Sequence, residues 1–391
     1  MSFASWAFGV FFTLVLVGLT ICRTRTQRQV VLLLASIYFY AYWKAAYILV
    51  LALPAIVDYW CAIAITSAKS PNKRKAWLVA SLTTNLGLLG YFKYSNFFLD
   101  NLRFAFGIHV PNLHIILPIG ISFFTFKTLS YTIDVYRGEI EPCRSLWRYS
   151  MFIAFFPELV AGPIVRASIF LPQMTKSLKP SAARFWVGIQ MMLLGFSKKL
   201  VVADNLALFV DAVFKSPASY SPATVTAAVV AYSLQIYCDF SGYSDIAIGA
   251  AKIIGFDFPE NFNMPYLSTS VVEFWRRWHI TLSNWLRDYL YFALPGFRKG
   301  ELERYRNLLV TMFLAGLWHG ASWTFVAWGC LHGVGITVNH AYQARKRPTR
   351  NSRLNRFVAW FATYTFICGT WILFRASSFS VAWAVCRKVP R

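Results

Sequence analysis

One histidine lies deep within a stretch of sequence that carries no charged residue. The stretch Asn307–Gln343 contains no Asp, Glu, Lys or Arg, and His319 is its 13th residue. At a helical rise of about 1.5 Å per residue, His319 would lie roughly 20 Å from the end of the stretch. An ionisable side chain at that depth is costly and usually faces a polar cavity where it has a function. A neutral imidazole that is hydrogen-bonded between helices is the alternative.

A second histidine, His279, directly follows a pair of arginines and a tryptophan in the segment Val271–Leu294. Polar residues recur in this segment at helical spacing opposite tryptophans and leucines, which predicts one amphipathic helix at a membrane interface. Arg276 and Arg277 could bind anionic lipid headgroups or the phosphates of a cofactor. His279 could take part in chemistry, or it could be one of the histidines that are common among interfacial anchors. We expect His332, which has a similar setting to His319, to pack between helices.

A cluster of helix-breaking residues precedes Arg166. Pro157, Gly162 and Pro163 interrupt the apolar segment Tyr149–Val165. Because proline removes a backbone donor and frees carbonyl groups that need new partners, we expect a broken or re-entrant element that faces a protein-lined cavity. The fixed charge of Arg166, which follows directly, suits the binding of an anion or a carboxylate.

Other patterns bear on the chemistry less directly. Asp239 and Asp245 flank a polar run in an apolar stretch, and this run either lines a cavity or joins helices by hydrogen bonds. The seven cysteines are scattered and no clustered ligands accompany them, so we expect no metal site. The sequence also contains no Walker A loop, no G-x-S-x-G elbow and no H-E-x-x-H motif.

Composition indicates that the elements carrying these residues lie in a membrane. Of the 391 residues, 57% are hydrophobic and only 14% are charged, whereas a soluble domain has about a quarter charged. The 39 Lys and Arg residues exceed the 16 Asp and Glu residues, for a net charge of +23. They gather at the ends of apolar runs, as the positive-inside rule predicts, and not on a solvated face, so we expect no nucleic-acid partner.

The apolar runs predict an all-α, polytopic membrane protein with about ten or eleven membrane-embedded segments, some of them broken or re-entrant. The first run, Trp6–Ile21, is expected to be a retained span, and alternating loop charge places the N-terminus outside and the loops at 23–28 and 69–75 in the cytoplasm. The uncharged stretch around His319 is long enough for two crossings with a hinge near residues 319–322. Basic clusters at 298–306 and 345–356 place both ends of this hairpin in the cytoplasm. We divide the chain into N-terminal helices (1–112), a catalytic core (113–341) and a C-terminal helix with a basic tail (342–391).

Several motifs, in order along the chain, resemble the membrane-bound O-acyltransferase family and its bacterial alginate O-acetylase branch. The matching segments are Leu117–Phe124 (LPIGISFF), 134–138 (DVYRG), Phe156–Arg166 (FPELVAGPIVR), Tyr237–Asp245 (YCDFSGYSD), Phe274–Ser283 (FWRRWHITLS), 316–323 (GLWHGASW) and 328–333 (WGCLHG). Together they span roughly residues 115–335, whereas the first 110 residues match only in hydropathy.

The resemblance implies tilted helices around a central funnel in the bacterial inner membrane, with several membrane passes. The family's invariant histidine matches His319, its second polar position matches His279, and an arginine that the alginate branch needs resembles Arg166. The family transfers an acyl group from a cytoplasmic donor, here acetyl-CoA as a co-substrate and not a bound cofactor, to an exported polysaccharide, commonly through a periplasmic partner protein. Alginate is the expected acceptor; cellulose, peptidoglycan and teichoic acid remain alternatives.

The residues and the resemblance agree on one reaction. An imidazole with a pKa near 6.5 is suited to take the proton from an acceptor hydroxyl, so we expect His319 to be the general base. His279 would orient the donor or assist proton transfer, and Arg276 and Arg277 would hold the phosphates of coenzyme A. A covalent acetyl-enzyme remains an alternative.

Two further expectations concern the class and the length of the protein. Transporters also use broken helices and buried histidines, but they usually contain an internal repeat, which this sequence lacks. Longer members of the branch continue with more helices, so we expect a chain that ends at Arg391 to be a truncated or frameshifted product.

Overall fold

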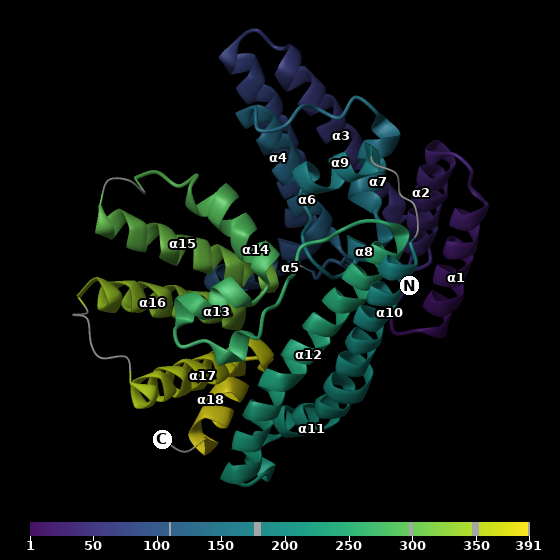
Figure 1. Ribbon diagram of the computed structural model, residues 1–391. Coiled ribbons are helices and arrows are strands. Elements are labelled where there is room, and N and C mark those ends of the chain that lie inside the picture. The colour runs from purple at the N-terminus through teal and green to yellow at the C-terminus, as the bar shows by residue number, and fades with distance from the viewer. Residues whose placement is uncertain (109–110, 176–180, 297–299, 346–351, 390–391) are drawn as a thin grey trace. The chain divides into compact units, whose positions relative to one another are not determined.

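The computed structural model describes residues 1–108, 111–175, 181–296, 300–345 and 352–389. Within these ranges the chain forms helices and connecting loops and has no β-strand, which confirms the all-α prediction (Figure 1). The predicted basic clusters fall partly at 297–299 and 346–351, which lie outside the described residues.

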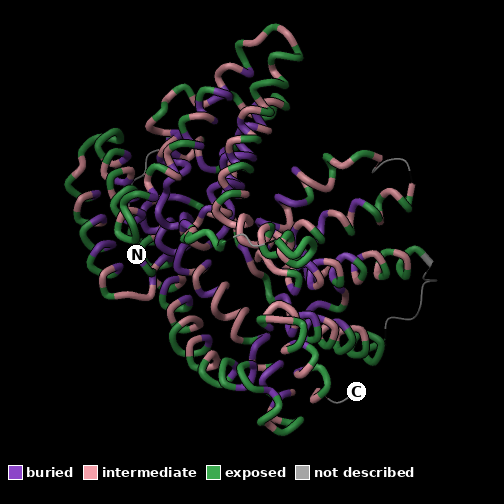
Figure 2. The backbone as a smooth tube through the Cα atoms, turned by 180° about the vertical axis from the view of Figure 1, so that it is seen from behind, coloured by how far each residue is buried: buried purple, intermediate pink, exposed green. Residues whose placement is uncertain are grey.

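The chain folds as two compact units. Unit 1 comprises Met1–Phe196 and Tyr243–Pro259, and unit 2 comprises Ser197–Gly242 and Glu260–Arg391. One long helix, α12 (Pro222–Ile254), contributes its first part to unit 2 and its last part to unit 1. Both units contain buried residues, drawn purple in Figure 2.

Unit 1 contains the N-terminal helices, of which the first two begin at a side-chain cap. Ser5 accepts a hydrogen bond from the Phe8 backbone, and Thr24 and Gln27 form a reciprocal capping box. The helices are α1 (Trp6–Ile21), α2 (Arg25–Ala41), α3 (Tyr47–Ser67), α4 (Pro71–Leu89), the π-helical segment η1 (Gly90–Tyr94), α5 (Ser95–Phe106), α6 (Ile121–Arg137), α7 (Leu146–Ala154), α8 (Phe156–Leu159), α9 (Ala167–Thr175) and α10 (Ala182–Phe196).

Two predicted boundaries in unit 1 were wrong. The apolar run predicted to span from Leu113 becomes helical only at Ile121, because Pro118 and a left-handed Gly120 stand before the helix. The loop predicted at residues 100–112 is helical as far as Phe106, where a left-handed Gly107 ends α5. A glycine adopts these backbone angles without the steric cost that other residues meet.

The predicted break in Tyr149–Val165 is confirmed. Helix α7 ends at Ala154, the single turn of α8 contains Pro157, and the chain is irregular from residue 160 to 166. A buried ion pair between Lys127 of α6 and Glu158 of α8 holds this segment, and the Lys127 ammonium also donates to the Phe152 carbonyl. The freed backbone is therefore stabilised from inside unit 1.

Unit 2 contains the histidine-bearing segments. Its elements, besides the first part of α12, are η2 (Ser197–Ala203, π-helical), α11 (Asp204–Lys215), η3 (Pro217–Ser219), η4 (Pro265–Leu267), α13 (Val271–Arg277), α14 (Ile280–Trp285), η5 (Leu286–Tyr291, π-helical), α15 (Glu301–His319), α16 (Trp323–Arg345), α17 (Arg353–Arg375) and α18 (Phe379–Lys388).

The predicted hairpin around residues 319–322 is confirmed, because α15 ends at His319 and α16 begins at Trp323. The two helices pack along each other (Figure 1). They approach so closely that a Cβ atom on Gly316 or Gly329 would collide with the backbone of the opposite helix. Glycine at these two positions is therefore what allows the hairpin to close.

One prediction in unit 2 was wrong. The segment Val271–Leu294 is not one helix: α13 ends at Arg277, and the chain turns at Trp278 and His279 before α14 begins. The basic tail contains a further helix, α18, whose N-cap Ser378 accepts a hydrogen bond from the Val381 backbone.

Three described helices are long and apolar enough to cross a membrane, namely α3, α12 and α17. Helix α1 is apolar but shorter, with 16 residues. The other predicted segments are shorter, interrupted or less apolar, so the predicted number of embedded segments stays a prediction.

Candidate active site

His319 is the last residue of α15 and stands at the turn of the hairpin. Its half-buried ring packs edge-on against Trp328 of α16 and Phe374 of α17, with centroid separations of 5.0 and 5.2 Å. Three helices that are adjacent in sequence thus form the aromatic wall around this imidazole.

His279 lies at the break between α13 and α14, where its backbone is left-handed, with φ at 42°. Few residues other than glycine and asparagine adopt this conformation, so the surroundings must stabilise it. Two backbone hydrogen bonds do so, from Ile280 to the Asn261 carbonyl and from Asn263 to the Arg277 carbonyl, both 2.9 Å long. The loop before η4 therefore fixes the turn that carries His279.

The His279 side chain is only 1% exposed and makes one hydrogen bond. Its Nδ1 lies 3.0 Å from the Oδ1 atom of Asn261, which is equally buried. The Nε2 atom is buried and has no hydrogen-bond partner among the described residues. Phe240 packs edge-on against the ring at 4.6 Å. A buried nitrogen without a partner is uncommon and calls for a specific explanation.

The two candidate catalytic histidines lie close together in unit 2. The ring of Trp318 contacts both His319, at 4.9 Å, and His279, at 6.5 Å. Burial lowers the pKa of His279 well below its ordinary value, and the charge on His319 lowers it further. His279 lies outside the three helices that could cross a membrane, and it is neutral at pH 7. The structure therefore brings together two imidazoles. That of His279 is neutral and hydrogen-bonded through one nitrogen, and that of His319 is half-exposed.

His332 behaves differently, as the sequence suggested. Trp275 donates a hydrogen bond to its Nδ1 at 3.1 Å, and its Nε2 lies 3.0 Å from the Thr370 hydroxyl. Because Trp275 can only donate, Nε2 carries the hydrogen of the neutral ring and donates to Thr370, which in turn donates to the Ile367 carbonyl. Every polar atom of this side chain is used within the protein, and His332 is a structural histidine.

The two arginines of α13 have different surroundings. The Arg277 guanidinium pairs with Glu273 at 2.9 Å, which offsets its charge. Arg276 is exposed and forms no ion pair with any described residue. The positive charges of Arg276 and Arg304 both act on the His340 imidazole of α16, so these three side chains lie near one another.

A pocket of about 400 Å³ lies beside these groups. Its lining includes the cation of Arg304, the imidazole of His340 and the phenol groups of Tyr291 and Tyr305, with Glu301 at its edge. Arg304 lies 3.6 Å from Glu301, and both side chains are more than half exposed, so that pair is weak. Aromatic faces and unneutralised cations suit a nucleotide phosphate.

Arg166 lies in unit 1, outside the unit that contains His279 and His319. Its carbonyl accepts the first hydrogen bonds of α9, from the backbones of Ile169 and Phe170 at 3.0 Å, and its side chain is half-buried. The broken segment of the preceding motif thus presents this guanidinium at the start of a helix.

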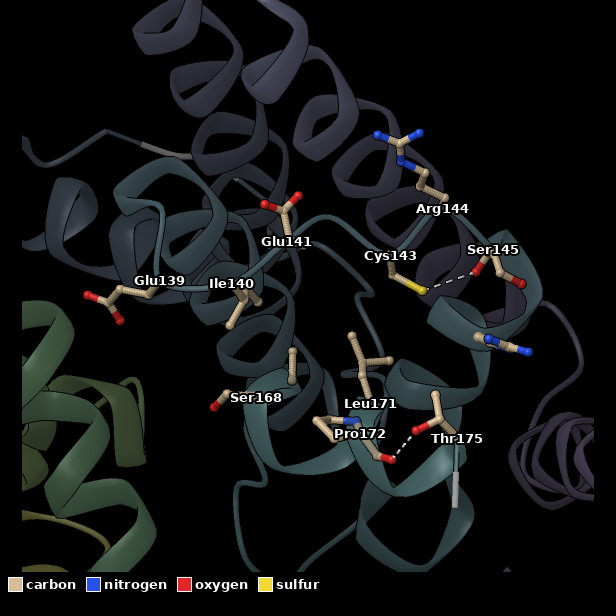
Figure 3. A pocket seen from close by; sticks show the side chains of 12 residues that line it. Glu139, Ile140, Glu141, Cys143, Arg144, Ser145, Ser168, Leu171, Pro172 and Thr175 are labelled. Carbon is tan, nitrogen blue, oxygen red and sulfur yellow. Dashed lines mark hydrogen bonds between the residues drawn. The ribbon is translucent and has the colours of Figure 1, made fainter. Parts of the chain in front are cut away.

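A separate pocket of about 820 Å³ lies in unit 1 between the loop after α6 and helix α9 (Figure 3). Apolar Ile140 and Leu171 line it together with Glu139, Glu141 and Arg144. None of the candidate site residues from the sequence is among its lining residues. Carboxylates and guanidinium groups are mixed around it, so its lining selects no single charge.

Sequence reasoning missed Asn261 as a site residue. It is 18 positions before His279 in a stretch that otherwise resembles a connecting loop, Asn261–Met264. The stretch around it mixes polar and apolar residues, with Glu260 before it and Asn263 after it, and nothing in its spacing points to a histidine. The polar run between Asp239 and Asp245 was expected either to line a cavity or to join helices. Asp239 joins helices, because it pairs with Lys199 at 2.5 Å and so links α12 to η2.

Comparison with known proteins shows what this chain is similar to. The model of the membrane-bound O-acyltransferase family matches residues 37–379. A probable alginate O-acetylase of Pseudomonas aeruginosa is 41% identical over 390 residues, which cover 98% of this chain and 74% of that protein. A peptidoglycan O-acetyltransferase of Helicobacter pylori is 37% identical over 90% of this chain and 71% of its own length. A teichoic acid D-alanyltransferase of Bacillus subtilis is 27% identical over 69% and 72%, respectively.

Proposed function

Because the chain belongs to the membrane-bound O-acyltransferase family, we propose that it moves acetyl groups from cytoplasmic acetyl-CoA toward the hydroxyl groups of exported alginate. The observation that carries the chemistry is the closeness of His279 and His319 in unit 2, where both rings lie against Trp318. The identity to an alginate O-acetylase supports alginate as acceptor. The matches to enzymes named for peptidoglycan and teichoic acid keep those two polymers as alternative acceptors.

In the proposed reaction His319 is the general base. It takes the proton of an acceptor hydroxyl while the oxygen attacks the thioester carbonyl carbon. The tetrahedral intermediate then collapses, the carbon–sulfur bond breaks, and the departing thiolate takes the proton from the His319 imidazolium. An imidazole can take and return a proton at neutral pH, because the ordinary histidine pKa of about 6.5 lies close to the pH of the medium. His279 assists proton transfer through its unused Nε2.

Arg276 is the better candidate of the two arginines for holding coenzyme A, because Arg277 is already paired with Glu273. We assign the phosphates of the donor to Arg276 and to the neighbouring pocket of Arg304 and His340. Arg277 would contribute by fixing the position of α13. Arg166, in unit 1, would bind an anion or carboxylate, and a carboxylate on each sugar unit of an alginate acceptor fits that role.

The remaining features of the proposal concern place and partners. The protein would span the bacterial inner membrane several times, with a catalytic core over residues 113–341 between N-terminal helices (1–112) and a C-terminal segment (342–391). Its donor would come from the cytoplasm, and a periplasmic acetyltransferase would pass the group to the polymer. The basic loops and the three apolar helices support this arrangement.

The decisive experiment compares His319→Ala with His114→Ala in purified protein in lipid nanodiscs. Loss of the general base should lower acetyl-CoA consumption by about 10²–10⁴-fold, whereas the exposed loop residue His114 should leave it unchanged. Both variants should be expressed and purified in the same yield as the wild type. Full activity of His319→Ala would contradict the proposal, and substrate flux into liposomes without acetyl-CoA consumption would favour a transporter.

A further inference from the structure

The hydrogen bonds around Asn261 determine which nitrogen of His279 carries a hydrogen. The Asn261 Oδ1 atom faces three groups: the Thr281 backbone N–H at 3.3 Å, the Thr281 hydroxyl at 2.9 Å and the His279 Nδ1 at 3.0 Å. A backbone N–H can only donate, so the atom that faces it must be the carboxamide oxygen and not the nitrogen. That oxygen can only accept, so His279 Nδ1 must donate.

The other ring nitrogen is therefore a free acceptor. A neutral imidazole has one N–H, and here Nδ1 holds it, so Nε2 has a lone pair. Nε2 is buried and makes no hydrogen bond within the described structure. His332, which is just as buried, uses both nitrogens and has the opposite tautomer. Burial alone thus does not explain the unused nitrogen of His279.

We propose that Asn261 is a positioning residue that holds His279 in the Nδ1–H tautomer, so that Nε2 accepts a hydrogen bond from a bound substrate beside His319. The donor is an O–H or N–H group of the reacting molecules that keeps its hydrogen, while the proton that leaves the acceptor hydroxyl passes to His319 and from there to the departing thiolate. This inference rests on the proposed function and adds to it a residue that no motif of the sequence marks as part of the site.

The charged groups on the surrounding elements do not compete for this role. Glu273 and Arg277 of α13 pair with each other, as do Arg287 and Asp288 of η5. Asp239 of α12 pairs with Lys199. The charge that acts on His279 is that of His319 on α15. Burial first and the charge of His319 second thus keep His279 neutral, and Asn261 selects which of its nitrogens carries the hydrogen.

The test replaces Asn261 by residues that keep or remove the acceptor. In Asn261→Asp a carboxylate would face Nδ1–H and favour the imidazolium, so the acid side of the pH–activity profile should move up by about one pH unit or more. In Asn261→Leu nothing selects the tautomer, and kcat should fall about tenfold or more while KM for acetyl-CoA changes little. Activity of Asn261→Asp should recover toward the wild-type value at high pH, where the imidazole is neutral again.

A matched control separates positioning from stability. Thr370→Val removes the partner of His332, the other fully buried histidine. It should lower thermal stability without moving the pH–activity profile. If Asn261→Asp left the profile in place, or moved it no further than Thr370→Val does, the proposal would be overturned.

A spectroscopic measurement on the wild type tests the tautomer directly. It needs neither well-folded variants nor the right acceptor polymer. Histidine-selective ¹⁵N NMR of the wild type in nanodiscs, with His279→Gln for assignment by subtraction, reports the tautomer without any turnover. A protonated-type shift at Nδ1 and an unprotonated-type shift at Nε2 are expected. The reverse pattern would refute the inference even if the enzyme were active. If the wild type consumed no acetyl-CoA, the proposed function would fail, but this measurement would still decide the tautomer.

Discussion

His279 and His332 differ in their hydrogen bonds although neither side chain is more than 1% exposed. Both nitrogens of His332 are hydrogen-bonded to neighbouring helices, and the residue stabilises unit 2. In His279 one ring nitrogen is hydrogen-bonded to Asn261, and the other has no hydrogen-bond partner among the described residues. Since a buried acceptor without a partner costs on the order of 1–3 kcal/mol, the fold keeps His279 at a loss in stability. Such a loss is typical of a functional site.

The acid sensitivity of the fold should reflect His279. Because burial holds the pKa of His279 well below its usual value, the unfolded chain binds a proton there that the folded chain does not. The free energy of unfolding should therefore fall as the pH drops below about 6.5, and His279→Asn should remove that part of the loss. Thermal unfolding midpoints at pH 7.5 and 5.0 measure this. Equal decreases in the wild type and the variant would contradict the assignment.

At the scale of elements, the site depends on how closely α15 and α16 approach. Gly316 and Gly329 face each other across the hairpin, and His319 follows Gly316 by three residues, at the turn. A separation of the two helices would therefore move His319 relative to Trp328, the aromatic wall that α16 supplies.

Gly329→Ala should open this hairpin. The added methyl group would meet the Met312 carbonyl and the Gly316 backbone, and neither can move without the helix, so we expect a loss of about 1–3 kcal/mol in stability together with lower activity. Gly369→Ala on α17 is the matched control, because its methyl group would meet nothing within 4 Å. Alanine favours helix over glycine by about 1 kcal/mol, so the control should keep or raise the unfolding midpoint. Similar losses in both variants would argue against a close crossing.

The break between α13 and α14 is the second element on which the site depends. Periodicity predicted one amphipathic helix there, because polar and aromatic residues on both sides of Trp278 keep nearly the same phase. The backbone bonds from Asn263 and Ile280 to the neighbouring segments outweigh that preference and place His279 in a left-handed turn. Hydrogen bonds between segments thus outweigh the helical periodicity of the sequence at this point.

At the scale of the whole molecule, the distribution of 39 basic residues predicts the orientation of the chain. The loop at 69–75 has four basic residues, and the one at 100–112 has a single arginine, Arg103. The first should face the cytoplasm and the second the outside.

Cysteine labelling would test this orientation in whole cells. In a background with the seven native cysteines replaced by serine, Asn72→Cys should react with an impermeant maleimide only after the membrane is permeabilised. Asn112→Cys should react before it. The reverse pattern would invert the proposed topology, and labelling of both positions in intact cells would contradict a membrane-crossing segment between them.

The sequence by itself determined the features that depend on local composition and periodicity. The first helix, the break at Pro157 and the hairpin turn beside His319 all follow from apolar period, proline chemistry and charge-free length, and the structure confirms each. The family was also readable, because its motifs are short, ordered and chemically distinctive. Each of these signals lies within a few tens of consecutive residues.

Only the tertiary structure decided how the candidate residues are used. Three features depend on segments that meet in space. They are the proximity of His279 and His319, the pairing of Arg277 with Glu273 while Arg276 has no ion pair among the described residues, and the contact of Asn261 with His279. A hydrogen bond between residues 18 positions apart across a loop leaves no periodic trace in the sequence. The physical reason is that a tautomer is set by the donors and acceptors around a ring, and those are assembled by folding.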